Sequence, residues 1–138
     1  MKPLEALLPH RAPSILLSEM REITAEGCLA LARVEADARY LDARGELPAW
    51  VGLELMAQAA SAFSGHRNTL SGRPVRVGYL LGTRSFTSAA PSFPIGAELE
   101  VEVRVIFLDD SGPSAFRCEI RRSGAVVAQA TLKAIEVP

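Results

Sequence analysis

A single carboxylate stands inside the longest apolar stretch of the chain. Residues 47–63 (LPAWVGLELMAQAASAF) contain one charged side chain, Glu54. Gln58 and Ser61 follow four and seven residues later, so a helix would place all three on one face. A carboxyl among apolar side chains is desolvated, which disfavours its charged form. A carboxyl that keeps its proton near neutral pH can act as a general acid, so we expect Glu54 to be catalytic.

His10 is the second candidate for proton transfer. It lies in the segment LLPHRAP, where Pro9 and Pro13 restrict the backbone on both sides. Imidazole is the usual proton-transfer group near neutral pH, so His10 could act as a general base. Both candidates have a structural alternative: Glu54 could pair with an arginine across a subunit interface, and His10 could bond to a backbone group. The other histidine, His66, lies in a polar context where we expect it to be solvated.

Composition excludes several other classes of protein. The 138 residues include 15 Lys plus Arg against 16 Asp plus Glu, a net charge of −1 that does not suit a nucleic-acid binder. Cys28 and Cys118 are too few for a disulfide scaffold or a zinc cluster, and we expect both to pack in the core. No phosphate loop, dinucleotide fingerprint or metal-ligand spacing occurs, so we expect no cofactor and no metal. Pro3 and Glu5 interrupt any signal peptide, which predicts one cytoplasmic domain over residues 1–138.

A helix must carry Glu54. Pro48 suits a first helical turn, the alanines and leucines that follow are good helix formers, and Gly65 is a natural stop. These residues predict a helix over about 48–64, in which Glu54 lies about two turns from the start, beyond the range of the helix dipole. A helix that is apolar on nearly all sides belongs in a membrane or in a core. Because a membrane span needs about 20 apolar residues, we expect a core helix and no membrane span.

Strand-like runs surround this helix. Residues 97–107 (AELEVEVRVIF) alternate apolar and charged side chains, the pattern of a sheet with one solvated face. Short turns that contain glycine then separate residues 115–121 and 125–137, which predicts a three-stranded antiparallel meander. The other predicted strands cover residues 15–24, 28–35 and 75–86, with a hairpin turn at 25–27.

These elements predict an α+β fold. A strand pair, one buried helix and four further antiparallel runs would wrap a curved antiparallel sheet around the central helix, which packs on the concave face. One sheet cannot cover the whole circumference of an apolar helix. We therefore expect a second copy to bury the remaining side, so that the protein is a dimer.

Three segments resemble the FabZ-type 3-hydroxyacyl-acyl-carrier-protein dehydratases. Residues 8–20 (LPHRAPSILLSEM) are similar to the opening motif of that family, and residues 48–60 (PAWVGLELMAQAA) are similar to its central-helix motif. Residues 77–103 (VGYLLGTRSFTSAAPSFPIGAELEVEV) resemble its third and fourth strands with their Pro–Gly turn. Taken together, these motifs look closest to the divergent dehydratases of aryl-polyene gene clusters. The resemblance covers about residues 4–108 and implies the hot-dog fold.

The resemblance implies that Glu54 is catalytic, because it follows Pro48 at the family's spacing. The family's catalytic histidine lies eight residues before this proline, where the present chain has Tyr40. No histidine occurs from position 11 to position 65, so the usual His–Glu pair is incomplete. His10 is the candidate replacement, because the resemblance places its segment beside the acyl tunnel. Tyr40 is a poor base but could donate a hydrogen bond.

The expected activity is that of a cofactor-independent hydro-lyase of fatty acid or polyene biosynthesis, which converts a 3-hydroxyacyl thioester on acyl carrier protein to the trans-2-enoyl thioester. His10 would remove the α-proton, and protonated Glu54 would protonate the leaving hydroxyl. Backbone N–H groups at Val51 and Gly52 would stabilise the enolate, and Gln58 would orient Glu54 or a water. Further substrate contacts are expected from Tyr40 and from the tunnel walls Trp50, Tyr79, Leu81 and Phe86.

Two other functions on the same fold stay open. The missing histidine favours a non-catalytic acyl-binding subunit that partners a complete dehydratase, and the fold also suits an acyl thioesterase. The expected partners are acyl carrier protein, with its phosphopantetheine-linked acyl chain, and a second hot-dog subunit in a homodimer or a heterodimer. The candidate residues for docking an acidic carrier protein are Arg67, Arg73, Arg76 and Arg84.

Overall fold

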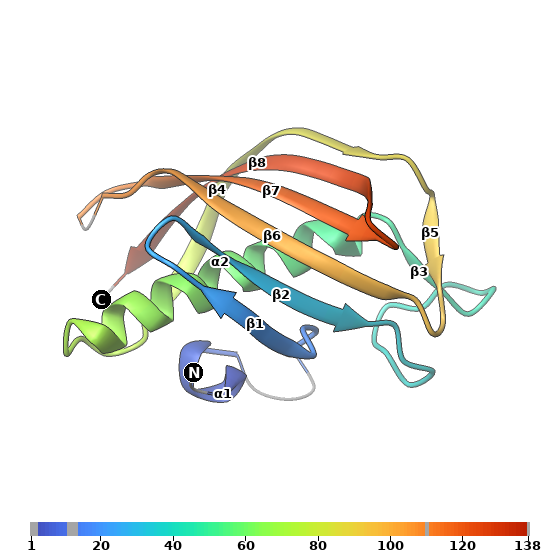
Figure 1. Cartoon of the computed structure of the whole chain (residues 1–138), viewed down its shortest axis with the longest axis horizontal. Coiled ribbons are helices and arrows are strands. Elements are labelled where there is room, and N and C mark those ends of the chain that lie inside the picture. Colours follow the sequence, from blue (N-terminus) through green and yellow to red (C-terminus); the bar gives the residue numbers. More distant parts are fainter. Residues whose placement is uncertain (1–2, 11–13, 110, 138) are drawn as a thin grey trace.

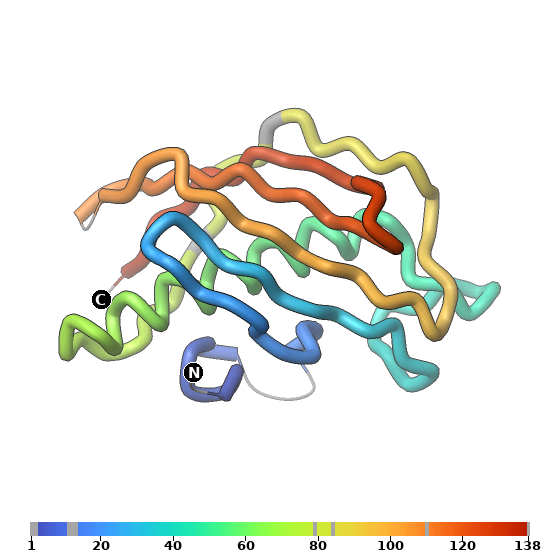
Figure 2. Tube along the Cα trace, viewed as in Figure 1, coloured from blue at the N-terminus to red at the C-terminus, as the bar shows by residue number. Residues whose placement is uncertain are grey.

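The computed structural model describes residues 3–10, 14–109 and 111–137, apart from the side chains of Tyr79 and Arg84. Six antiparallel strands form one curved sheet in the order β1-β2-β6-β7-β8-β4 (Figure 1). A long helix, α2, lies along the inner face of this sheet, as predicted (Figure 2). The strands of the sheet are β1 Glu19–Ile23, β2 Gly27–Arg33, β4 Val77–Ser88, β6 Glu98–Phe107, β7 Ser114–Arg122 and β8 Ala125–Val137.

Three short elements lie outside the main sheet. The helix α1, Leu4–Leu7, precedes β1, and the strands β3, Glu46–Pro48, and β5, Ser92–Pro94, pair with each other as a separate ribbon. None of the three was predicted, because each is too short to show a period. In the part of the chain that the structure describes, no helix has the length and apolar character of a membrane span.

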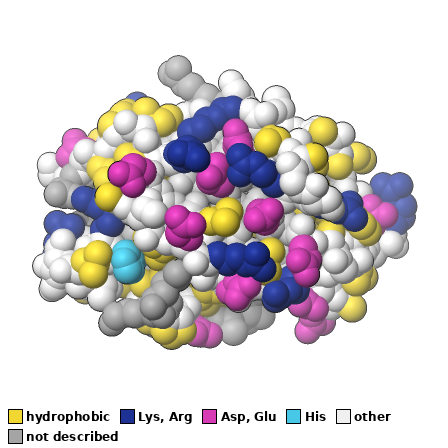
Figure 3. Space-filling model, viewed as in Figure 1, with side chains coloured by type: hydrophobic (Ala, Val, Ile, Leu, Met, Phe, Trp, Pro, Cys, Tyr) yellow, Lys and Arg dark blue, Asp and Glu magenta, His cyan; other side chains and the backbone are white. Residues whose placement is uncertain are grey.

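The predicted meander is present as β6, β7 and β8, with each strand antiparallel to the next. Along β6, Leu99, Val101 and Val103 are fully buried against α2, while the side chains between them reach the outer face. Acidic and basic side chains are interspersed on that outer face (Figure 3), and several of them pair, among them Arg33 with Glu19. The alternation therefore separates a dry inner face from a solvated outer face, as expected.

Helix α2 spans Val51–Leu70 and is longer than the predicted helix over 48–64. Pro48 does not open the helix, because it lies in β3 opposite Ser92. At the other end, the predicted stop at Gly65 is wrong, and the helix continues for five more residues.

Gly65 has a packing role instead of a stop role. A Cβ atom at this position would overlap the carbonyl oxygen of Leu7, so the glycine lets α1 lie directly against α2. Leu7 and Leu8 are buried there in a small cluster with Ala62. This contact fixes the segment that leads from α1 to His10 beside the central helix.

The first strand is shorter than predicted. Residues 15–18 do not belong to β1, which begins at Glu19. The backbone N–H of Leu16 bonds to the side chain of Gln58 rather than to a neighbouring strand. The chain before β1 is therefore attached to α2.

Candidate active site

One cavity follows α2. It has a volume of about 350 Å³ and lies between the helix and the half of the sheet formed by β7, β8 and β4. The helical side chains that line it recur every three or four residues from Leu53 to Asn68, which is the spacing of one helical face. The cavity is therefore a groove along nearly the whole helix. Small side chains line its middle: Ala57, Ala60, Ser61 and Ser64.

His10 and Glu54 meet at one end of this groove. His10 Nε2 lies 3.8 Å from Glu54 Oε1, and both residues line the cavity. The separation is longer than a direct hydrogen bond, so both groups can approach neighbouring atoms of one bound molecule. The structure thus brings together the two residues that were predicted to transfer protons, although they lie 44 positions apart in the chain.

Gln58 bonds to Glu54 and to the chain that leads into β1. Its side-chain amide donates to Glu54 Oε1 at 3.2 Å and to the carbonyl oxygen of Ser14 at 2.8 Å. Its carbonyl oxygen accepts from the Leu16 N–H at 2.8 Å. Gln58 is 1% exposed and does not line the cavity, so it positions Glu54 rather than touching a bound molecule.

The surroundings of Glu54 differ from those predicted. Because α2 begins at Val51, the carboxylate lies in the first turn, within range of the partial positive charge at the helix start. Its side chain is 45% exposed, so the predicted desolvation is wrong for the single chain. The helix turns this flank toward the groove rather than toward the core. Among the described residues, the charged partner recorded for Glu54 is His10, and no arginine pairs with it.

Two aromatic side chains stand next to the pair. Trp50 lines the cavity and is largely exposed. Tyr40 does not line the cavity; its ring meets that of Trp50 edge-on, with the centroids 5.7 Å apart. Tyr40 has a φ of 70°, which is uncommon for a residue other than glycine. Within the described part of the chain, the tyrosine at the family's histidine position therefore reaches the groove through Trp50.

The other predicted contacts are not gathered at the groove. Val51 and Gly52 are buried and do not line it, and the Gly52 N–H donates to the Ala49 carbonyl at 2.9 Å, so it is not available to an enolate. Leu81 is exposed on β4, and Phe86 packs against the main core. The side chain of Tyr79 lies outside the described part of the structure.

Sequence reasoning missed several lining residues. Leu80 of β4, Phe116 of β7 and Leu132 of β8 form the apolar wall opposite the helix. No local pattern identifies them, because the pairing of distant strands brings them together. The helical residues Ser64 and Asn68 could have been found by extending the Glu54 face in steps of three and four.

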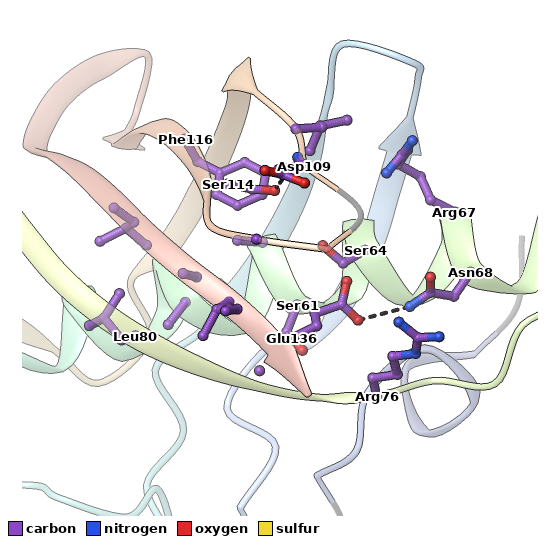
Figure 4. Close-up of a pocket in the computed structure, with 18 of the residues that line it drawn as sticks. Ser61, Ser64, Arg67, Asn68, Arg76, Leu80, Asp109, Ser114, Phe116 and Glu136 are labelled. Atoms are coloured by element: carbon purple, nitrogen blue, oxygen red, sulfur yellow. Dashed lines mark hydrogen bonds between the residues drawn. The ribbon is translucent and has the colours of Figure 1, made fainter. Parts of the chain in front are cut away.

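The opposite end of the groove is polar (Figure 4). The Asn68 amide donates to a carboxylate oxygen of Glu136 at 2.8 Å. Arg67, Arg73 and Arg76 also line this end. The side chain of Arg84, the fourth predicted docking residue, is not among those described.

Neither thiol belongs to the site. Cys28 and Cys118 are buried in the core, as predicted, and desolvation raises the pKa of each thiol to about 12. Both therefore stay protonated near neutral pH and are poor nucleophiles. Among the described residues, no three His, Cys, Asp or Glu side chains gather as metal ligands would.

Comparison with protein families gives a match over almost the whole chain. The sequence model of the ApeP-like family, described as ApeP dehydratase, matches residues 2–138. A search of curated proteins gave no match. The family match agrees with the predicted resemblance to the dehydratases of aryl-polyene clusters.

Solved structures share the fold. "The Dehydratase Heterocomplex ApeI:P from Xenorhabdus doucetiae" is 27% identical, with a TM-score of 0.96, over 100% of this chain and 93% of that chain. The TT0310 protein from Thermus thermophilus is 19% identical, with a TM-score of 0.66, over 99% of this chain and 100% of its own. A mutant phenylacetic acid degradation protein PaaI from the same organism is 19% identical, with a TM-score of 0.65, over 97% of both chains. These similarities confirm the predicted hot-dog fold.

Proposed function

Because this chain belongs to the ApeP-like dehydratase family, we propose that it dehydrates a 3-hydroxyacyl thioester carried on acyl carrier protein to the trans-2-enoyl thioester. The observation that carries the proposal is the His10–Glu54 pair, with Nε2 and Oε1 3.8 Å apart in the groove. Dehydration needs a base at the α-carbon and an acid at the hydroxyl of the next carbon. Those two carbons share one bond, so a base and an acid this close together can serve both.

His10 and Glu54 together account for every proton transfer in the proposed reaction, and no cofactor takes part. His10 Nε2 removes the α-proton, and the electron pair of that C–H bond forms an enolate with the thioester carbonyl. When a bound substrate shields it from solvent, the protonated Glu54 carboxyl gives its proton to the β-hydroxyl, the C–O bond breaks, and water leaves as the double bond forms. The imidazolium then returns a proton to the Glu54 carboxylate, directly or through a water, which restores both groups.

The residues around the pair support these roles. Gln58 holds the Glu54 carboxylate by a hydrogen bond and attaches the segment after His10 to the same helix. Trp50 and Leu53 line the groove beside Glu54 and offer an apolar surface on which the acyl chain can begin.

Substitution of the pair tests the proposal. Glu54→Gln and His10→Ala should each lower the rate of enoyl formation from a 3-hydroxyacyl carrier protein at least about 100-fold. Glu22→Gln and His66→Ala are matched controls, since neither residue lines the groove, and both should keep the wild-type rate. Full turnover by Glu54→Gln would remove Glu54 from the mechanism. Release of free thiol instead of an enoyl thioester would assign the chain to thioester hydrolysis.

A second candidate function is that of a subunit in a dehydratase heterocomplex. One of the similar structures, that from Xenorhabdus doucetiae, is a dehydratase heterocomplex. In the present chain, β4 is an edge strand of the sheet and exposes the apolar side chains of Val77, Leu80 and Leu81. An exposed, apolar edge strand is a surface on which another sheet can pair. We therefore propose that a second hot-dog subunit adds its own edge strand along β4.

The two candidates give different results with the isolated chain. A complete enzyme forms enoyl thioester when it is purified alone. A non-catalytic subunit forms no enoyl thioester when it is alone. It binds the acyl carrier protein, or the product appears only after a second hot-dog subunit is added. Light scattering on the chain mixed with acyl carrier protein, and on the chain mixed with a second hot-dog subunit, identifies which complex forms.

A further inference from the structure

The tyrosine at the family's histidine position has an unusual backbone. Tyr40 lies in the loop between β2 and β3, at the end of the molecule where α2 begins (Figure 1). Its φ of 70° belongs to the left-handed region, which is unfavourable for a bulky side chain and persists only where surrounding contacts hold it. The contacts made by this side chain are therefore the evidence for its role.

Trp50 and Arg39 hold the ring of Tyr40. The ring of Trp50 meets it at an interplanar angle of 65°, with the centroids 5.7 Å apart, which is a favourable edge-to-face geometry. The guanidinium carbon of Arg39 lies 5.5 Å from the centroid of the tyrosine ring, within the range of a cation–π contact. Both contacts are made by the ring rather than by the hydroxyl group.

Arg39 attaches the ring of Tyr40 to the chain before β1. Its Nη1 donates to the Ser14 hydroxyl at 3.3 Å. The carbonyl oxygen of that serine accepts a hydrogen bond from Gln58 of α2. The ring is therefore fixed on one side by the aromatic residue at the start of α2, and on the other side by a chain of contacts that returns to the same helix.

Trp50 stands beside the proposed acid. Its backbone already has helical angles, φ −62° and ψ −23°, and it precedes Glu54 by four residues, so the two side chains share one flank of the helix. Helical side chains lean toward the N-terminus, which directs the carboxylate over the turn that Trp50 begins. Both residues line the groove, and both are partly exposed in the single chain. A molecule that lies against the indole therefore also covers the carboxylate.

We propose that Tyr40 is a positioning residue, whose ring holds the Trp50 indole against a bound acyl thioester, so that substrate and indole together exclude water from Glu54. This inference rests on the proposed function and adds a role to it: the residue at the family's histidine position acts through its ring, while the proton transfers belong to His10 and Glu54. An indole that is fixed in advance loses less side-chain freedom on binding than a mobile one. Exclusion of water strengthens the electrostatic interactions inside the site.

The fluorescence of Trp50 tests this positioning directly, because the chain contains one tryptophan. Tyr40→Asn removes the ring but suits the backbone, since asparagine adopts a positive φ more readily than most residues. Time-resolved anisotropy should show fast local rotation of the indole in Tyr40→Asn. That rotation should be lost in the wild type and in Tyr40→Phe, which keeps the ring.

An unreactive probe tests whether the indole covers the substrate. The probe is the amide analogue of a 3-hydroxyacyl thioester, made on phosphopantetheine. Saturation of the wild-type chain with this probe should lower the quenching of Trp50 by acrylamide, because a molecule bound in a groove buries the side chains that it contacts. Neither this measurement nor the anisotropy depends on turnover.

Enoyl formation tests the consequence for catalysis. Tyr40→Asn should lower kcat/KM about 10-fold, the value of one edge-to-face aromatic contact, while Tyr40→Phe should retain most of the wild-type value. Arg39→Gln removes the cation–π contact and should give a smaller loss. Arg44→Gln is the matched control in the same loop, since its side chain is exposed and does not line the groove, and it should keep the wild-type rate.

Several outcomes would overturn the proposal. Equal losses in Tyr40→Phe and Tyr40→Asn would assign the role to the hydroxyl group. A wild-type kcat/KM in Tyr40→Asn, an indole that is equally rigid without the ring, or no protection of the indole by the probe would show that Tyr40 does not hold Trp50 against the substrate. The proposed function fails separately. A rigid, protected indole in a chain that forms no enoyl product, alone or with a second hot-dog subunit, would contradict the dehydratase function and support the role of Tyr40.

Discussion

Gln58 donates a hydrogen bond to Glu54 at 3.2 Å from a side chain that is almost completely buried. The same amide group bonds to the backbone at Ser14 and Leu16, which follow the segment that carries His10. One buried side chain therefore holds the Glu54 carboxylate and attaches the chain before β1 to the same helix.

Gln58→Leu should lower both stability and activity. Leucine has a similar size but cannot bond to the Ser14 carbonyl or the Leu16 N–H, and it releases the Glu54 carboxylate. We expect a loss of about 1–3 kcal/mol in the free energy of unfolding, measured by urea denaturation, together with a slower rate of enoyl formation. A variant with wild-type stability and rate would show that the three hydrogen bonds do not position the pair.

Gly65→Ala should destabilise the protein, although alanine is the better helix former. Helix propensity alone predicts a gain of about 1 kcal/mol in the middle of a helix. In the structure a Cβ atom would overlap the Leu7 carbonyl oxygen, so α1 must move away and carry the segment of His10 with it. Thermal unfolding should give a lower midpoint for this variant. Gly82→Ala is the control, since a Cβ there meets no atom within 4 Å.

Stability should fall at alkaline pH because of the two buried thiols. Burial raises the pKa of Cys28 and of Cys118 from 9.0 to about 12. Below pH 9 the thiols are protonated in both the folded and the unfolded chain, so they do not make the free energy of unfolding depend on pH. Between pH 9 and pH 12 they ionise only in the unfolded chain, and the free energy of unfolding decreases with each pH unit.

Urea denaturation at several pH values checks this prediction. From pH 8 to pH 10.5 each thiol should account for a loss of about 2 kcal/mol. Cys118→Ala should show a shallower decline than the wild type over the same range. Equal slopes, or rapid alkylation of both thiols in the folded protein at pH 8, would contradict the burial of these groups.

Leu81→Glu should prevent association along β4 without unfolding the chain. Leu81 is 53% exposed on the edge strand and does not line the groove, so a charge there should disturb a contact with a second subunit and leave the groove intact. Light scattering should report a smaller particle for this variant than for the wild type. Ile95→Glu, at a similarly exposed apolar residue outside β4, should leave the particle size unchanged. The same reduction in size with both variants would place the interface elsewhere.

Local patterns were sufficient to predict most of the sheet. Residues 97–107 alternate in steps of two, and the structure places their apolar members on the inner face of β6. Residues 125–137 were predicted without error at either end. In both segments, burial of one face requires apolar side chains at every second position. This alternation is complete within a few residues, so the sequence alone shows it.

The bounds of α2 were less predictable. Pro48 and Gly65 are ordinary start and stop signals, and both were misread. Pro48 pairs with Ser92 across the short ribbon, and Gly65 accommodates the backbone of Leu7. A local signal has several physical meanings, and the contact made by a distant segment selects one of them.

By itself, the sequence determined the fold class, the apolar helix and the two candidates for proton transfer, because residue type and short-range period are sufficient for these. Only the tertiary structure brought His10 to 3.8 Å from Glu54, bonded Gln58 to Glu54 and to the backbone at Ser14 and Leu16, and opened the groove that ends at the arginines. Each of these features joins residues far apart in the chain. Their distances depend on how strands and helix pack together, and no pattern within one segment records that packing.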